Sequence, residues 1–377
     1  MARDILDAVY GCLIGGAIGD ALGAPVEGLY YTEIRERYGK ITELMPSTIG
    51  NTGTTYGGSA EDSFREAYDG PVGKPGATTD DTAYRHYLCY AIVRKGGRIT
   101  PDDWAQVWLE KLNPRRFWVN EKAILWKLKA GMNPWDAGRG SIPAGCATMG
   151  IAPIGIINAA NPAQAFQDAF NIAFLNQEDY NRDAAATMAA GVAAALTPGA
   201  TVESVLGAMA SHSTYIVSRA IEMAMDLACA SGSVEEFTEK YYARLLDWTW
   251  PCPPQEKWNK DHNFSGSSAE VVSVSAALLH LCQGDVNRCL VEGASFGRDC
   301  DTIAGLVGSL AGALQGASAI RSDWIETCER ANEDLFVELE GDGRANFHSM
   351  ARRLVEALRA EQRAAQERAE LLQRMLA

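Results

Sequence analysis

The sequence lacks the cysteine and histidine patterns that mark disulfide scaffolds and zinc sites. Its nine cysteines are an odd number, lie singly, and include no C-x-x-C pair, so no disulfide framework or redox motif is indicated. It has only five histidines, and no two are spaced as metal ligands, so a zinc site is not expected. We predict that cysteines with apolar neighbours are small core residues of a protein in a reducing compartment: Cys12, Cys89, Cys146, Cys282 and Cys289.

The sequence also lacks an excess of basic residues and a long apolar run. Lys and Arg number 34 against 48 Asp and Glu, a net charge of -14, which argues against a nucleic-acid partner and against an anionic membrane surface. The longest apolar runs, near residues 184–196 and 303–314, are too short and too rich in small residues to span a bilayer. The N-terminus shows no signal-peptide pattern, and we therefore expect a cytoplasmic protein.

No segment alternates convincingly between apolar and polar residues, so strands are not predicted and an all-α fold is. With neither an internal repeat nor a linker, we expect one compact helical domain over residues 1–345 and a C-terminal helix over 346–377. Shorter helical patterns surround Trp104 to Leu112 and Ile124 to Leu128. The longer helices are expected over residues 4–24, 82–94, 163–175, 181–196, 202–211, 216–230, 234–248, 269–282, 287–295 and 302–315.

Glycine is frequent where a helix should disfavour it. The first expected helix contains Gly11, Gly15, Gly16, Gly19 and Gly23, each of which costs a helix roughly 1 kcal/mol. Two explanations stand side by side: close packing of this helix on another, or close approach of its backbone to a ligand.

Two stretches lack helical periodicity. Residues 39–76 are rich in Gly, Ser, Thr and Asp and precede an acidic segment, so a substrate-covering loop is expected there. Residues 247–268 are also irregular. Their Trp248-Thr249-Trp250, like Phe117-Trp118, has the character to stack a base, although aromatic residues at such spacing are more often core.

The C-terminal segment has a narrow apolar stripe among Arg, Glu and Gln. Such a stripe is typical of a solvent-exposed helix or a short coiled coil. The helix either packs back on the body or forms a homodimer. The stripe consists of Leu354, Leu358, Ala365, Leu372 and Met375.

The most informative features are two acidic clusters more than two hundred residues apart, Thr78-Thr79-Asp80-Asp81-Thr82 and Gly297-Arg298-Asp299-Cys300-Asp301-Thr302. Crowded carboxylates repel one another unless a positive charge lies between them. If the fold joins the clusters, their oxygens suit Mg²⁺, Mn²⁺ or Ca²⁺. The alternative is helix capping, but a cap needs one such residue, and each cluster supplies two acids and at least one hydroxyl.

On these residues the chain resembles the ADP-ribosylglycohydrolases, the family that includes the dinitrogenase-reductase-activating glycohydrolase. The resemblance spans roughly residues 5–316 and implies an all-helical fold with two Mg²⁺ ions, or Mn²⁺, in a cleft. The matching segments occur in the family's order: Gly11 to Gly23 with Glu27 after it, Thr79-Asp80-Asp81-Thr82, Trp135-Asp136-Ala137-Gly138 before Ile151 to Gly155, and Asp299-Cys300-Asp301-Thr302.

The resemblance implies roles for individual residues. Glu27, Asp136 and Asp301 are the expected catalytic acids, with Glu27 and Asp136 as acid/base or water-positioning groups. Gly145 and Asp20 are the expected substrate-binding residues, although Asp20 is better explained as a structural residue that bonds backbone groups near the site. The implied metal ligands are Thr79, Asp80, Asp81, Asp299, Asp301 and Thr302.

Two departures from the family pattern bear on the substrate. A Gly-Asn-Gly segment followed by Met-Arg is replaced by Gly145 to Gly150, without the Asn and Arg, and the segment 176–180 lacks a Thr-His pair. We therefore expect ADP-ribosylated protein or a small ribosyl conjugate as substrate, with a nucleoside as the close rival. A non-catalytic ADP-ribose-binding protein and a two-metal phosphoryl transferase are further alternatives; the latter would need basic clamps, and Arg298 is the only cation in a cluster.

Overall fold

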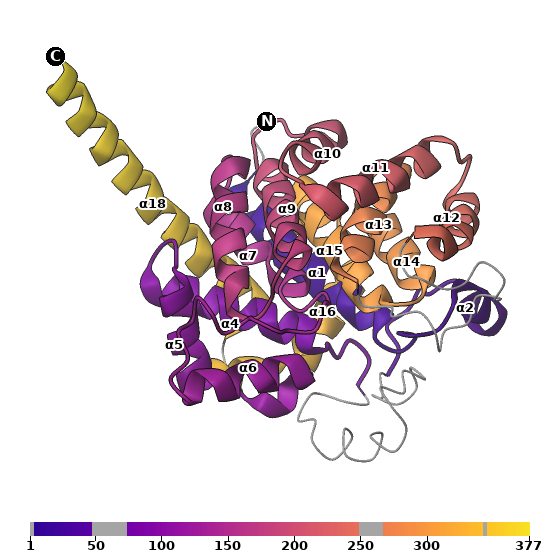
Figure 1. Cartoon of the computed structure of the whole chain (residues 1–377). Coiled ribbons are helices and arrows are strands. Elements are labelled where there is room, and N and C mark those ends of the chain that lie inside the picture. The colour runs from indigo at the N-terminus through magenta and orange to yellow at the C-terminus, as the bar shows by residue number, and fades with distance from the viewer. Residues whose placement is uncertain (1–3, 47–73, 249–266, 342–344) are drawn as a thin grey trace.

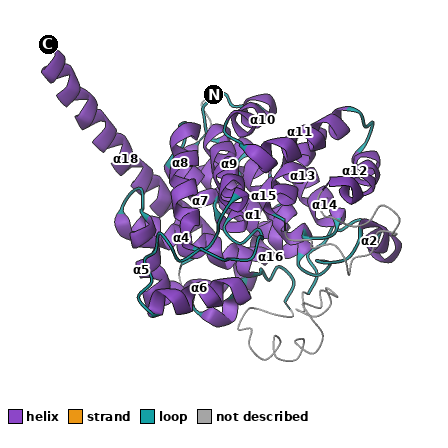
Figure 2. Cartoon of the chain, in the orientation of Figure 1, coloured by secondary structure: helices purple, strands orange, loops and turns teal. Residues whose placement is uncertain are grey.

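The structure is a computed structural model that describes residues 4–46, 74–248, 267–341 and 345–377. In these residues the chain forms seventeen α-helices and no strand (Figures 1 and 2), which confirms the all-α prediction. The helices are α1 (Ile5–Gly23), α2 (Tyr31–Tyr38), α4 (Asp80–Lys95), α5 (Pro101–Lys111), α6 (Val119–Lys129), α7 (Ala152–Ile157), α8 (Pro162–Ile172), α9 (Tyr180–Ala195), α10 (Val202–Ser211), α11 (Tyr215–Cys229), α12 (Val234–Trp248), α13 (Ser268–Leu281), α14 (Val286–Phe296), α15 (Cys300–Gln315), α16 (Ser322–Ala331), α17 (Glu333–Glu340) and α18 (Phe347–Leu376).

The centre of the fold is an antiparallel pair, α1 and α15, whose backbones touch. A Cβ atom added at Gly11 would lie 2.3 Å from the Gly312 carbonyl oxygen, and one at Gly19 would lie 2.2 Å from the Ala304 carbonyl oxygen. Real Cβ atoms do not approach backbone so closely, so only glycine permits this spacing. The same holds along the whole seam, so helix packing accounts for these glycines: Gly11, Gly15, Gly19 and Gly23 against Gly312, Gly308, Ala304 and Asp301.

The remaining helices surround this pair. α14 and α13 pack on α15, and α9 packs on α13, α8 and α15. α9 is an alanine-rich helix with almost every residue buried, and its small side chains let the neighbouring helices approach closely. Figure 1 shows α1, α9 and α15 in the middle of the body, with α5 and α6 on one side and α11 and α12 on the other.

Among the described helices, α1 alone has the length and apolar composition of a membrane-spanning segment. Because 78% of its most apolar window is buried inside the body, it is a core helix. The five cysteines predicted to lie in the core are buried, and the cysteines in the described residues are free thiols.

Half of the C-terminal helix packs back on the body, which is one of the two arrangements considered from the sequence; the dimer stays a prediction. The first half of α18 packs on α1, α4 and α7, with Leu354 fully buried. Every residue from 362 to 377 is exposed, and Figure 1 shows this half of α18 projecting away from the body.

Candidate metal centre

The two acidic clusters meet at the helix ends that the α1–α15 seam brings together. Asp299 is the N-cap of α15, Thr79 is the N-cap of α4, and Glu27 follows the C-terminal end of α1. The seam ends where a Cβ on Gly23 would lie 2.3 Å from the Asp301 backbone nitrogen. Close packing at this end therefore sets the position of Asp301 relative to Glu27.

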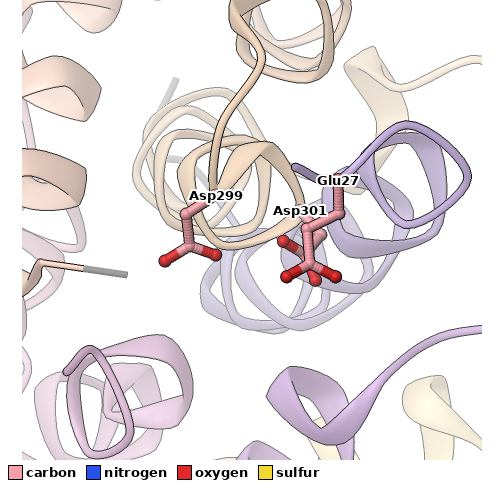
Figure 3. Close-up of side chains that lie close together, drawn as sticks. All are labelled: Glu27, Asp299 and Asp301. Atoms are coloured by element: carbon pink, nitrogen blue, oxygen red, sulfur yellow. The ribbon is translucent and has the colours of Figure 1, made fainter. Parts of the chain in front are cut away.

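Side chains of the early and late clusters contact one another. Oxygens of Glu27, Asp299 and Asp301 all lie within 4.8 Å of one another (Figure 3). The Thr79 hydroxyl donates to an Asp301 carboxylate oxygen at 3.5 Å. The Thr302 hydroxyl lies within hydrogen-bonding reach of both Asp81, from the early cluster, and Asp299. The meeting of segments predicted from the sequence is thus present in the fold.

Asp20 anchors the start of α4 through its carboxylate. Its fully buried carboxylate accepts from the Thr79 backbone N–H at 3.0 Å, the Thr82 backbone N–H at 3.0 Å and the Thr82 hydroxyl at 2.6 Å. These hydrogen bonds match the structural role expected from the sequence, in which Asp20 bonds backbone groups near the site. These hydrogen bonds all go to the start of α4, so Asp20 positions Thr79 and Thr82.

The site has oxygens that the protein leaves without partners. One carboxylate oxygen of Asp81 and one of Asp301 are buried and accept no hydrogen bond. Leaving such atoms unpaired is costly, so these oxygens fit a cation rather than an apolar ligand. The donors are carboxylates and hydroxyls without sulfur or imidazole, a set that suits Mg²⁺ or Mn²⁺.

The electrostatics of the cluster also favour a cation. Burial, followed by the charges of Glu27, Asp81 and Asp299, raises the pKa of Asp301 well above its usual value. Burial and the charge of Glu121 raise the pKa of Asp80 to about 7, and burial raises that of Asp299 to about 6. Without a positive charge between them these carboxylates therefore resist ionisation, and a divalent cation would reverse that preference.

A buried acid that the sequence did not single out lies beside Asp80. Glu121 of α6 is fully buried, and its charge is the second largest influence on the pKa of Asp80 after burial. One of its oxygens has no hydrogen-bond partner; the other accepts from the side-chain amides of Asn120 at 3.3 Å and Asn176 at 3.5 Å. The only signal in the sequence was an acid next to Asn120 in a helix, which resembles an ordinary surface position.

The expected catalytic acid Asp136 and the expected substrate-binding residue Gly145 lie in different surroundings. Asp136 is 45% exposed and forms an ion pair with Arg139 at 3.2 Å; the contacts of the cluster described above do not include it. Gly145 is buried next to Cys146, and burial followed by the charge of Glu121 raises the pKa of the Cys146 thiol well above its usual value. The segment in which the sequence departs from the family therefore reaches the cluster through Glu121.

The Arg298 side chain faces Glu270 in the interior. Its guanidinium donates to the Glu270 carboxylate at 2.8 Å, and both side chains are almost completely buried. Its backbone adopts a φ of 60° and bonds the segment after α1, with N–H donating to Leu29 and C=O accepting from Gly28, both at 2.7 Å. Arg298 thus fixes the turn that carries Asp299, and it does not act as the basic clamp that phosphoryl transfer would need.

Two sequence predictions lie outside the described residues. The loop expected over 39–76 falls mostly on residues 47–73, and Trp250 belongs to 249–266. Of the other aromatic pair, Phe117 is buried in the core, against Tyr87.

The body is all-helical in the described residues, and an acidic site lined by oxygens lies at the ends of its central helices. The family model for ADP-ribosylglycohydrolase matches residues 1–364, and the chain belongs to this family. The match ends within α18, near the start of its exposed second half. Family membership supports a glycohydrolase activity.

The chain is also similar to individual proteins over most of its length. The chain is 26% identical over 335 residues to the uncharacterized protein YegU of Escherichia coli (strain K12), covering 83% of this chain and 89% of the relative. It is 25% identical over 332 residues to an uncharacterized protein of Archaeoglobus fulgidus, covering 84% and 89%. A solved structure described as an ADP-ribosylglycohydrolase-related protein complex superposes with a TM-score of 0.63 at 20% identity, covering 94% of this chain and 99% of that one, which supports the fold.

Proposed function

We propose that the protein is a glycohydrolase that uses two Mg²⁺ ions, with Mn²⁺ as a substitute, to cleave an ADP-ribosyl linkage at the anomeric carbon of ribose. The observation that carries the proposal is the meeting of Thr79 with Asp301 and of Asp299 with Glu27. The residues proposed to hold the ions are Thr79, Asp80, Asp81, Asp299, Asp301 and Thr302.

In this proposal the metal ions and the acidic side chains have different tasks in the reaction. Bound divalent cations lower the pKa of a water molecule and orient the hydroxyls of a sugar. Glu27 is the half-buried member of the Glu27–Asp299–Asp301 group, in which both aspartates are buried. We assign to Glu27 the transfer of a proton to or from the substrate. Carboxylates around the anomeric carbon also stabilise the positive charge of an oxocarbenium-like transition state.

The second acid of the reaction has two candidates. Asp136 is the position matched by the family resemblance, but its carboxylate pairs with Arg139 on the surface. Glu121 is buried beside Asp80 with one free oxygen. Substitution of each acid, described in the Discussion, distinguishes them.

The test is a product assay with purified, metal-stripped protein to which Mg²⁺ is restored. Substrates are ADP-ribosyl-arginine, ADP-ribosyl-serine and a panel of nucleosides. Release of free ADP-ribose is expected. Free ribose from nucleosides would instead support the smaller-substrate alternative, and tight ADP-ribose binding without turnover would support a binding protein.

Asp301→Asn is the variant that tests the metal site, because it keeps the size of the side chain and removes one charge from the cluster. We expect turnover to fall by at least about a thousandfold and the Mg²⁺-induced rise in Tm to shrink. Normal turnover in this variant would refute the assignment, and the Tm measurement reports on the metal site independently of the substrate.

A further inference from the structure

The tip of α18 exposes apolar side chains that the body does not cover. Residues 362–377 are all exposed, including Leu372 at 44% and Leu376 at 86%. In Figure 1 this arm extends beyond the body with no neighbouring element. An isolated helical segment this short is marginal in water, so contact with another surface would stabilise it.

One face of the arm has the spacing of a coiled-coil seam. Its positions are separated alternately by four and three residues, the a and d spacing of a heptad repeat. None of them is charged, although the segment from 358 to 377 contains four Arg and three Glu. The seam residues are Leu358, Gln362, Ala365, Ala369, Leu372 and Leu376.

A groove lies where the arm leaves the body. It has a volume of about 590 Å³ and is lined on its apolar side by Ile5, Ile157, Val355, Leu358 and Ala365. The base of the arm is fixed there by Glu361, which accepts from the Arg98 backbone N–H at 2.8 Å. The groove therefore opens next to the first seam residues.

We propose that a second copy of this chain occupies the seam, with the two arms antiparallel and centred near residue 367. In that register residue 358 lies opposite 376, 362 opposite 372, and 365 opposite 369, so each a position meets a d position. Leu376 of each copy then enters the groove at Leu358 of the other. The contact is the same on both sides, so a two-fold axis closes the assembly as a dimer.

Size and charge favour a second copy over an unrelated partner. The alanines fall at the centre, where small side chains let two helices approach, and leucines fall at both ends. Three Arg and two Glu leave the arm nearly neutral, whereas the whole chain carries -14. The arm is therefore a surface on which two copies of this acidic protein meet without strong repulsion.

Neighbouring leucines test the proposal with a matched control. Leu372 is on the seam and Leu371 is off it, yet they are 44% and 50% exposed. Sedimentation of full-length wild-type protein in EDTA should give a dimer, twice 40.7 kDa. Leu372→Glu should raise the dissociation constant at least about a hundredfold, because two carboxylates per dimer would be buried. Leu371→Glu should not change it.

A monomeric wild-type protein, or equal effects of the two substitutions, would overturn the proposal. Unchanged Tm values at a concentration where wild type is monomeric would show that both variants fold.

Cysteine cross-linking tests the direction of the arms. In a Cys229→Ser background, a mixture of Gln362→Cys and Leu372→Cys chains should form a disulfide between the two different chains, which mass spectrometry of the linked peptides identifies. Linkage of Leu372→Cys to itself would show parallel arms and refute the register.

Discussion

At the residue scale, the candidate site is a set of buried acids whose charge states depend on burial and on one another. In the metal-free protein, burial and neighbouring charges raise the pKa of Asp80 to about 7 and of Asp299 to about 6. Both lie above the values of about 3.9 expected in an unfolded chain. Their contribution to stability is therefore full below about pH 4 and is lost as pH rises through 6 to 7.

The rise in Tm on adding Mg²⁺ should consequently grow between about pH 5 and about pH 8, because protons compete with the ion at low pH. Thermal unfolding with EDTA and with Mg²⁺ at each pH measures it. Asp136→Asn, a change outside the cluster, should retain the wild-type trend. A Mg²⁺ effect that is equal at all pH values would contradict the prediction.

Paired substitutions of the two candidate second acids should have unequal effects on catalysis. We expect Glu121→Gln to lower kcat by about a hundredfold or more, since positioned acids and bases contribute roughly that much. Asp136→Asn should lower it less than about tenfold, because the Asp136 side chain is paired with Arg139 at the surface. Steady-state rates on the substrate found in the product assay decide between them, and the reverse order would restore Asp136 as the acid.

The limits of sequence reasoning are visible at this scale. Thr79, Asp81 and Asp301 were predicted together because carboxylates and hydroxyls crowd into two short segments. Glu121 was not predicted, because nothing in the sequence around a single acid on a helix shows whether that acid is buried or exposed. Only the fold, which brings Glu121 close enough to Asp80 to raise its pKa, gives this acid a role, and that proximity is not encoded in any short window of sequence.

At the element scale, the site depends on how closely α1 approaches α15. Gly19→Ala should destabilise the protein by about 2 kcal/mol or more, because its Cβ would lie 2.2 Å from the Ala304 carbonyl oxygen and must separate the two helices. The Mg²⁺-induced rise in Tm should fall as well, since the same seam positions Asp301.

Gly207→Ala in α10 is the control. A Cβ at this exposed position meets no atom within 4 Å, so the protein should become more stable by about 0.5–1 kcal/mol. Chemical denaturation of both variants measures the difference. Equal effects would mean that helix propensity, rather than the seam, explains the result for Gly19.

Helices with a clear period were predicted within a few residues, as for α10 over residues 202–211. Others were not predicted. α7 has six residues and is apolar all round, so it shows no period at all. α16 carries a clear helical period, because Trp324, Cys328 and Ala331 follow i, i+4 and i+7.

At the scale of the whole molecule, a net charge of -14 opposes self-association through the bodies. If the arms pair as proposed, dimerisation should tighten with salt, because ions screen repulsion between the bodies while the nearly neutral seam is little affected. We expect the dissociation constant to fall about threefold or more between about 50 and 500 mM NaCl. Sedimentation at both ionic strengths measures it, and weaker association in high salt would instead point to an interface held by ion pairs.

The contact between Thr79 and Asp301 also has a consequence for biosynthesis. A nascent chain that has emerged from the ribosome only as far as α4 already contains the early acidic cluster, yet it lacks the late cluster that begins at Gly297. If the site binds a cation as proposed, binding must wait until α15 has been translated and has docked against α1. A bound ion would therefore indicate that the early and late acidic clusters have come together in the folded protein.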